Sequence, residues 1–273
     1  MKVLVVNDDG INAKGINVLA ESLRKKYEVF VLAPHVNRSC SSNCIIMQTA
    51  LEIEPFKDSQ GNQIKNMYSI TGFPADCTIS GLKSGLFPKI DVVVSGINDC
   101  ANMGTDIIYS GTCGAARQAT LYGVPAIAVS LSTGGTEPDK SKLKYEALSK
   151  FVSDNLPHLA LLCGRKDSEV PGECKYFVNI NAFSLDSYKG VKLTHPCIRE
   201  YCDSVELKKK EGDSFSTQFR PGDKMISLFY PELPEETSDY RAVMDGYISI
   251  SRILSEPGFS MTASSKILDN FVL

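Results

Sequence analysis

The first two thirds of the chain alternate between short runs of consecutive apolar residues and segments in which apolar residues recur every three or four positions. The continuous runs have the length of strands and are rich in β-branched residues, as in strands buried on both faces of a parallel sheet. They lie at residues 2–7, 27–32, 91–94, 124–131 and 176–181, and we expect the last of them to end the sheet. Because a strand, a helix and a second strand nearly always cross over into a parallel sheet, this order predicts a mostly parallel α/β fold.

Helices are predicted between these strands. Asn12 is a suitable N-cap for a helix that ends near Lys26, and Pro74 suits the first position of a second helix. The expected core positions are Ile16, Leu19 and Leu23 in the first helix and Ile79, Leu82 and Leu86 in the second. Two further helices are expected at residues 111–121 and 142–162, the latter bent or broken at Pro157.

Two parts of the chain depart from this alternation. Residues 45–53 and 65–70 resemble strands joined by a turn at residues 58–62, which predicts an inserted hairpin. Beyond Ala182, short alternating strands surround the charged turn Lys208–Glu211, and a helix is expected at residues 260–271. We therefore expect a main domain at residues 1–185 and a C-terminal extension at residues 186–273. The extension has little core of its own, so it should pack on the main domain and on a partner subunit.

Composition narrows the class of protein. The net charge of the 273 residues is −3, so the chain has no general attraction to a nucleic-acid polymer or an anionic membrane. No apolar stretch reaches the roughly 18 residues of a membrane span, and the N-terminus lacks the apolar region of a signal peptide. The nine cysteines have no zinc-binding spacing and are expected to be reduced, mostly buried thiols. These features favour a cytoplasmic protein.

Short oxygen-bearing side chains follow three of the predicted strands. Asp8 and Asp9 come directly after the first strand, Ser39 lies in the loop after the second, and Asn98 follows the strand at residues 91–94. Ligands of open α/β sheets bind outside the carboxyl ends of the strands, so these side chains are expected at one edge. Adjacent carboxylates repel each other, and a hard divalent cation offsets that cost. A tight turn at Asp9-Gly10 and capping of the next helix are the two alternative explanations of the acids.

A second candidate site opens the predicted helix at residues 111–121. Ser110, Gly111 and Thr112 stand where free backbone N–H groups and the helix dipole favour an anion such as phosphate. A tightly packed helix start with Ser110 as its cap would explain the same residues. The combination with an adjacent metal site is more specific than either feature alone.

Three other phosphate-binding or phosphate-accepting folds do not fit the spacing. Gly10 and Gly15 have the interval of a P-loop, but Ile16-Asn17 replaces its Lys-Ser/Thr pair. No G-x-G-x-x-G follows the first strand, which argues against a dinucleotide fold. A receiver domain would need a phosphoacceptor Asp at the end of a middle strand, whereas Asp91 precedes its strand.

Five stretches of the chain form a specific combination. They are VNDDG (Val6–Gly10), APHVNRSCSSN (Ala33–Asn43), GFPADC (Gly72–Cys77), VSGIN (Val94–Asn98) and IYSGTCGAARQATLYGVPAIAVS (Ile108–Ser130). In order and spacing they resemble the SurE survival-protein family of metal-dependent nucleotidases.

This resemblance implies a Rossmann-like α/β fold with a mostly parallel sheet, helices on both faces and a C-terminal extension of β-hairpin and helix. It implies that the extension exchanges between the subunits of a homodimer or homotetramer. It also implies hydrolysis of nucleoside monophosphates, as a 5′- or 3′-nucleotidase, with one Mg²⁺ or Mn²⁺ ion per subunit. The metal ligands of the family correspond to Asp8, Asp9, Ser39 and Asn98, which match in residue type. The chain departs from the family at Cys100-Ala101, where typical members have Gly-Pro, at Cys113, and in the tail after Tyr247.

Metal-assisted hydrolysis is the mechanism that we expect from this set. A divalent ion held by Asp8, Asp9, Ser39 and Asn98 would lower the pKa of a bound water; alternatively, Asp8 or Asp9 would orient or deprotonate that water. The side chains and backbone expected to hold the phosphate oxygens belong to Asn43, Asn102, Ser110, Gly111 and Thr112. Two alternatives stay open: a phosphatase or phosphotransferase with a non-nucleotide phosphomonoester substrate, and a non-catalytic nucleotide-binding module. The repulsive acid pair counts against the module.

Overall fold

The computed structural model describes residues 1–132, 142–164, 174–220, 222, 225–228 and 230–257. The strands of the main sheet are β1 (Lys2–Val6), β2 (Glu28–Pro34), β3 (Ile53–Lys57), β4 (Gln63–Ile70), β5 (Val92–Asn98), β6 (Ala126–Ser132), β7 (Tyr176–Phe183), β8 (Val191–Thr194) and β13 (Ile248–Leu254). The helices are α1 (Lys14–Arg24), α2 (Pro74–Lys83), α3 (Asp106–Tyr109), α4 (Gly111–Leu121), α5 (Glu146–Leu161) and α6 (Asp239–Met244). Outside the main sheet, β9 (Ile198–Tyr201) pairs with β12 (Met225–Leu228), and β10 (Ser204–Lys209) pairs with β11 (Phe215–Arg220).

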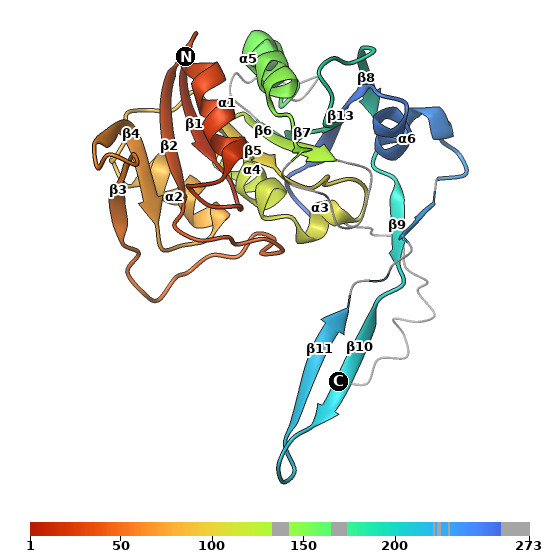
Figure 1. Ribbon diagram of the computed structural model, residues 1–273. Coiled ribbons are helices and arrows are strands. Elements are labelled where there is room, and N and C mark those ends of the chain that lie inside the picture. Colours follow the sequence, from red (N-terminus) through yellow and green to blue (C-terminus); the bar gives the residue numbers. More distant parts are fainter. Residues whose placement is uncertain (133–141, 165–173, 221, 223–224, 229, 258–273) are drawn as a thin grey trace, which may run out of the picture.

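Within these residues the main sheet has nine strands in the order β3-β4-β2-β1-β5-β6-β7-β13-β8. Only the β3–β4 and β7–β13 pairs are antiparallel among its described neighbours, so the predicted mostly parallel α/β fold is confirmed. Strand β1 lies between β2 and β5 (Figure 1), so the chain moves outward in opposite directions from it. A crevice for ligands is expected at the carboxyl end of such a topological switch point.

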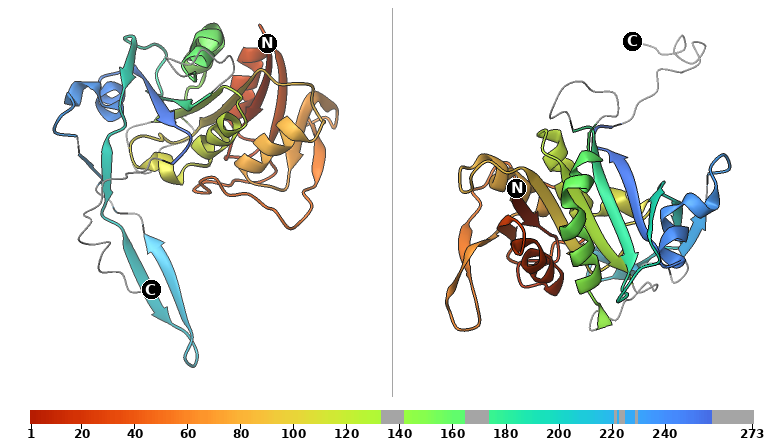
Figure 2. Two further views of the ribbon diagram at one scale, coloured as in Figure 1. Left: turned by 180° about the vertical axis from the view of Figure 1, so that it is seen from behind. Right: turned by 90° about the horizontal axis from the view of Figure 1, so that it is seen from above.

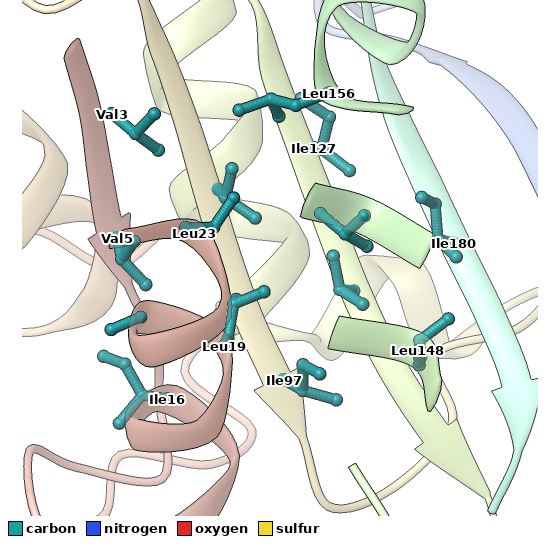
Figure 3. Packing of buried hydrophobic residues seen from close by; sticks show 14 of the residues in the cluster. Val3, Val5, Ile16, Leu19, Leu23, Ile97, Ile127, Leu148, Leu156 and Ile180 are labelled. Carbon is teal, nitrogen blue, oxygen red and sulfur yellow. The ribbon is translucent and has the colours of Figure 1, made fainter. Parts of the chain in front are cut away.

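Helices cover both faces of the sheet, as Figure 2 shows from behind and from above. Successive residues of β1 alternate between the two faces: Val3 and Val5 belong to the core beneath α1 and α5, whereas Leu4 and Val6 belong to the core beneath α2 and α4. All four side chains are fully buried. Figure 3 shows the first of these cores, where side chains of β1, β5, β6 and β7 pack against the two helices. Burial on both faces explains why the apolar run of β1 is continuous.

The helix predictions are partly confirmed. Helix α4 has the predicted bounds, and the expected core face of α1 is fully buried. The predicted cap Asn12 is wrong, because residues 10–13 form a turn closed by the 3.0 Å bond from Ala13 N to Gly10 O, and Ala13 holds the N-cap position. The helix predicted at residues 142–162, bent or broken at Pro157, is α5, which continues through Pro157 without a break.

The predicted core face of α2 is confirmed only in part: Leu82 packs against the core beneath α2 and α4 but is only partly buried. The residues that α2 buries are Pro74, Ala75, Asp76, Cys77, Thr78 and Gly81, most of them small. Small residues let α2 approach its neighbours closely: Thr78 Oγ1 donates to Ala115 O of α4 at 3.1 Å, and a Cβ on Gly81 would lie 2.6 Å from Leu4 Cδ2. Leu86 lies beyond the end of the helix.

Two strand predictions need correction. The inserted hairpin is confirmed, but its first strand begins at Ile53 rather than at residue 45. Strand β7 does not end the sheet, because β13 pairs with it and β8 follows. Both added strands come after residue 185, so the proposed domain boundary there does not coincide with the edge of the sheet.

The hairpin of β10 and β11 stands away from the rest of the described chain in Figure 1. Its turn is closed by the 2.9 Å bond from Lys210 N to Ser214 O, close to the predicted charged turn. The predicted helix at residues 260–271 lies outside the described residues. None of the helices that the structure describes is long and apolar enough to cross a membrane.

Candidate active site

Asp8 lies at the switch point, two residues after Val6, the last residue of β1. Its carboxylate is buried, with 3% of the residue exposed. Thr112 at the start of α4 donates two hydrogen bonds to it, from Oγ1 at 2.6 Å and from the backbone N at 3.3 Å. No Lys, Arg or His side chain of the described residues forms an ion pair with Asp8, and burial raises the pKa of its carboxyl above the ordinary value. A buried carboxylate that lacks a cationic side chain is a suitable position for a bound cation.

The Asp9 side chain contacts both the residue after β5 and the loop after β2. Its Oδ2 accepts a hydrogen bond from Asp99 N at 3.3 Å, and its Oδ1 lies 3.4 Å from Asn37 Nδ2. Asn98 precedes Asp99 and is buried, and its Nδ2 donates to Cys100 O at 2.6 Å. Since β1 and β5 are parallel neighbours, their carboxyl ends emerge side by side.

Ser39 is brought to the same edge by the loop after β2. Arg38 N donates to Asp8 O at 2.7 Å, and Ser39 N donates to Asn37 Oδ1 at 2.9 Å. Because Asn37 also contacts Asp9, one amide side chain connects the Ser39 backbone to the acid pair. The structure therefore brings together the three loops that carry the four predicted metal ligands.

The start of α4 is packed tightly against two of these loops. A Cβ on Gly111 would lie 2.6 Å from Ser41 Oγ and 3.0 Å from Asp8 Cβ, and a Cβ on Gly114 would lie 2.1 Å from Ser42 O. Only glycine fits at such distances. Ser110 caps the helix, since its Oγ accepts from Cys113 N at 3.0 Å. The capping that we considered as an alternative for Ser110 is thus present, next to the acid loop.

The two asparagines predicted to bind phosphate differ in their surroundings. Asn43 Nδ2 donates to Gln118 Oε1 at 3.0 Å, while its Oδ1 is buried without a hydrogen-bond partner. Asn102 is engaged with the sheet: its Nδ2 donates to Ser130 Oγ at 2.8 Å, and its backbone bonds the side chains of Asn179 and Asn181. Asn43 therefore has an unused polar atom near α4, whereas Asn102 holds the long loop on β6 and β7.

Sequence reasoning did not assign a role to Ser41. Its hydroxyl is buried without a hydrogen-bond partner and lies against Gly111. The only local signal is its position two residues after Ser39 in the same polar stretch.

A metal-binding group of three or more His, Cys, Asp or Glu side chains does not occur within the described residues. The predicted ligand set is of another kind, with two carboxylates, one hydroxyl and one amide. These are hard oxygen ligands of the type that Mg²⁺ and Mn²⁺ prefer.

Fold and site together define an α/β protein with oxygen-bearing side chains at its switch point, beside the N-terminus of a helix. The family model "Survival protein SurE" matches residues 3–203. This chain belongs to the SurE family, which confirms the resemblance drawn from the five sequence stretches.

Relatives and a solved structure agree over nearly the whole chain. The chain is 37% identical to the 5′-nucleotidase SurE of Histophilus somni in an alignment of 276 positions, which covers 98% of this chain and 99% of that protein. It is 34% identical to the 5′-nucleotidase SurE of Thermosipho africanus over 253 residues, covering 93% and 91% of the two chains. The crystal structure of the SurE protein from Aquifex aeolicus has a TM-score of 0.69 at 27% identity and covers 98% of this chain and 97% of its own.

Proposed function

We propose that this chain is a 5′-nucleotidase that hydrolyses nucleoside monophosphates to a nucleoside and phosphate. The names of the relatives support this activity. The observation that carries the proposal is the buried Asp8 carboxylate, which has no ion pair with a described cationic side chain and is bonded directly to the first turn of α4. This arrangement is suited to a cation and a phosphate at adjacent positions.

The proposed cation is one Mg²⁺ or Mn²⁺ ion per subunit, held by Asp8, Asp9, Ser39 and Asn98. The donor set fits, because a carboxylate accepts about four hydrogen bonds or metal contacts and Thr112 occupies only part of that capacity on Asp8. The amide N of Asn98 is bonded to Cys100 O, so its Oδ1 serves as the ligand atom. A divalent ion at this position would supply a Lewis acid and a bound water of lowered pKa.

Asp8 and Asp9 have different surroundings and therefore different proposed roles. Thr112 fixes Asp8 in orientation, so Asp8 is suited to anchoring the ion. Asp9 takes longer contacts from Asp99 N and Asn37 Nδ2, and it is suited to orienting or deprotonating the attacking water.

The phosphate is proposed to sit at the N-terminus of α4, with contacts from the Ser110 hydroxyl and the backbone N–H of Gly111. Thr112 donates both its N–H and its hydroxyl to Asp8, so it is better suited to orienting that carboxylate. Asn43 would offer the phosphate its Nδ2, which in this structure donates to Gln118 Oε1, because its free Oδ1 is an acceptor. Ser41 adds a hydroxyl against Gly111. Asn102 is better suited to fixing the loop than to touching phosphate, because its side chain is bonded to Ser130.

We further propose a homodimer or homotetramer formed through the β10–β11 hairpin. Alternate residues of the two strands lie on one face, and Val205 pairs with Phe219 across the hairpin. The apolar residues of that face are between 57% and 64% exposed: Val205, Leu207, Phe215 and Phe219. A second copy of the chain would cover this apolar face.

A cytoplasmic location is part of the proposal. All nine cysteines lie in the described part of the chain, and no disulfide forms there. Only four of them are buried, so the expectation of mostly buried thiols is wrong. Reduced thiols are typical of a reducing compartment.

The proposal is tested by phosphate release from AMP with chelated and metal-loaded protein. Activity should be absent in EDTA and return with Mg²⁺ or Mn²⁺. Asp9→Asn should lose at least about a hundredfold in kcat with the fold intact. Asp213→Asn in the exposed β10–β11 turn is the matched control and should retain wild-type activity. Full activity in EDTA, or near wild-type activity of Asp9→Asn, would refute the metal-dependent mechanism.

A further inference from the structure

Tyr109 adjoins both parts of the proposed phosphate site, which are the start of α4 and the loop after β2. It ends α3 and directly precedes Ser110, the N-cap of α4. Its carbonyl accepts from Ser42 N at 2.9 Å, and the carbonyl of Ile108 accepts from Ser42 Oγ at 2.8 Å. The backbone at Tyr109 is therefore fixed to the loop that also carries Ser39. Since adjacent Cα atoms are about 3.8 Å apart, the ring lies within roughly 10 Å of Ser110.

The side chains at this position are unusually exposed for apolar residues. Tyr109 is 55% exposed and Ile108 is 60% exposed. Both belong to α3, which is only four residues long, and neither contributes to the two cores of the sheet. Large exposed apolar side chains beside a polar site are typical of a binding surface.

The Tyr109 ring is supported from one side by the C-terminal part of the chain. The ring of Tyr201 at the end of β9 meets it edge to face, with ring centroids 6.4 Å apart. Strand β9 is joined to the α3 segment by two bonds between Thr105 and the backbone of Arg199, at 3.0 and 3.1 Å. These contacts fix the position of one aromatic ring relative to the other.

The hydroxyl of Tyr201 is bonded to a partly buried carboxylate, that of Asp106. This hydroxyl donates to Asp106 Oδ1, and Arg199 Nη1 donates to Asp106 Oδ2. The Arg199 side chain is only 8% exposed, so it holds Asp106 from inside the molecule. An exposed ring that is supported in this way is rigid before a ligand arrives, which reduces the entropy lost on binding.

We propose that Tyr109 is the nucleobase platform of the site, with Tyr201, Asp106 and Arg199 as positioning residues. This inference rests on the proposed nucleotidase function and names the part of the substrate that this chain recognises beyond phosphate. A nucleoside monophosphate has its base one sugar length from the phosphate, and every base has a planar face that can stack on an aromatic ring. The platform therefore favours nucleotides over sugar phosphates without selecting strongly among bases.

Three variants separate stacking from other roles of the residue. Tyr109→Ala removes the ring, and Tyr109→Phe retains it. Tyr122→Ala is the matched control, because Tyr122 is another exposed tyrosine at the opposite end of α4, roughly 18 Å from Ser110 along the helix axis. The substrates are AMP and ribose 5-phosphate, which share the phosphate and the sugar and differ in the base.

The expected result is a selective loss. Tyr109→Ala should raise KM for AMP about tenfold and leave kcat/KM for ribose 5-phosphate within about twofold of wild type. Tyr109→Phe and Tyr122→Ala should stay within about twofold of wild type on both substrates. If neither substrate is hydrolysed, dissociation constants for the same two compounds from calorimetry replace KM.

Other outcomes would overturn the inference. An equal loss on both substrates would show that the ring supports the loop, and an unchanged KM for AMP would show that no base touches it. A change of oligomeric state in Tyr109→Ala, seen by light scattering, would assign the exposed ring to an interface between subunits. A wild-type chain that hydrolyses ribose 5-phosphate as well as AMP would refute the platform while leaving the phosphatase chemistry intact. A chain that binds AMP more tightly than ribose 5-phosphate but releases no phosphate would refute the proposed function and support the platform.

Discussion

Thr112 Oγ1 lies 2.6 Å from a carboxylate oxygen of Asp8, although 104 positions separate the two residues in the chain. This bond joins the carboxyl end of β1 to the first turn of α4. It fixes the orientation of a buried carboxylate and sets the proposed metal position next to the proposed phosphate position.

Loss of the Thr112 hydroxyl should destabilise the fold. Thr112→Val keeps the side-chain volume but leaves the Asp8 carboxylate with one donor fewer, so the free energy of unfolding should fall by about 2 kcal/mol at neutral pH. Thr112→Ser keeps the hydroxyl and should lose less. Urea unfolding in EDTA measures both variants. Equal stability of the Val and Ser variants would mean that the bond contributes little.

The close approach of α4 to the loop after β2 should make Gly114 intolerant of substitution. In Gly114→Ala the new methyl would meet Ser42 O at 2.1 Å, so the loop that carries Ser39 has to move. We expect a loss of about 2 kcal/mol in stability and a larger loss of activity. Gly164→Ala is the control, because its methyl would have no neighbour closer than 3.5 Å. An active, fully stable Gly114→Ala protein would contradict this packing.

The partly buried Asp106–Arg199 ion pair should contribute to stability only while both partners are present. Burial raises the pKa of Asp106 even though Arg199 and Tyr201 act to lower it, so desolvation outweighs the attraction. Arg199→Met alone leaves the Asp106 carboxylate without its cation and bonded to the Tyr201 hydroxyl, and it should lower the free energy of unfolding by about 2 kcal/mol. Adding Asp106→Asn removes that charge and should restore part of the loss. A double-mutant cycle from denaturant unfolding measures the coupling, and simple additivity of the two changes would contradict it.

The apolar face of the β10–β11 hairpin should control oligomeric state. Phe219→Glu places a charge on this face and should shift the protein from a dimer or tetramer to a monomer in light scattering. Gln218→Glu adds the same charge to the opposite face of the hairpin and should leave the oligomer unchanged. A monomeric wild-type protein, or identical masses for the two variants, would contradict the proposed interface.

The parts of the fold that depend on local pattern could be predicted from the sequence. Strand β1 is a continuous apolar run, and α1 has apolar residues at helical spacing, while α4 is rich in small residues. Because ligands of parallel sheets bind at the carboxyl ends of the strands, the sequence also predicts a site at Asp8, Asp9 and Asn98. The buried face of α2 could not be predicted, because small residues such as Gly81 are buried there by the close approach of Leu4 and α4. That contact is a property of the tertiary structure and leaves no hydrophobic stripe.

The pairing of strands that are far apart in the sequence could not be predicted either. Strand β13 pairs with β7, so that Ile250 lies opposite Ile180, and the local sequence around β13 does not indicate its partner strand. In the same way, the sequence predicts a phosphate contact for Asn102 but does not predict its partners in the structure, which are Ser130 of β6 and Asn179 and Asn181 of β7. Polar residues in loops can be recognised as candidates from sequence, but their partners are fixed only by folding.

The most direct test of the central claim is the stoichiometry of Mn²⁺ binding, measured by calorimetry on metal-stripped wild type, Asp9→Asn and Asp213→Asn. One ion per chain should bind to the wild type and to Asp213→Asn, and binding should be lost or strongly weakened in Asp9→Asn. Undiminished binding of Mn²⁺ to Asp9→Asn, or the absence of binding to the wild type, would contradict a metal site at the junction of the three loops.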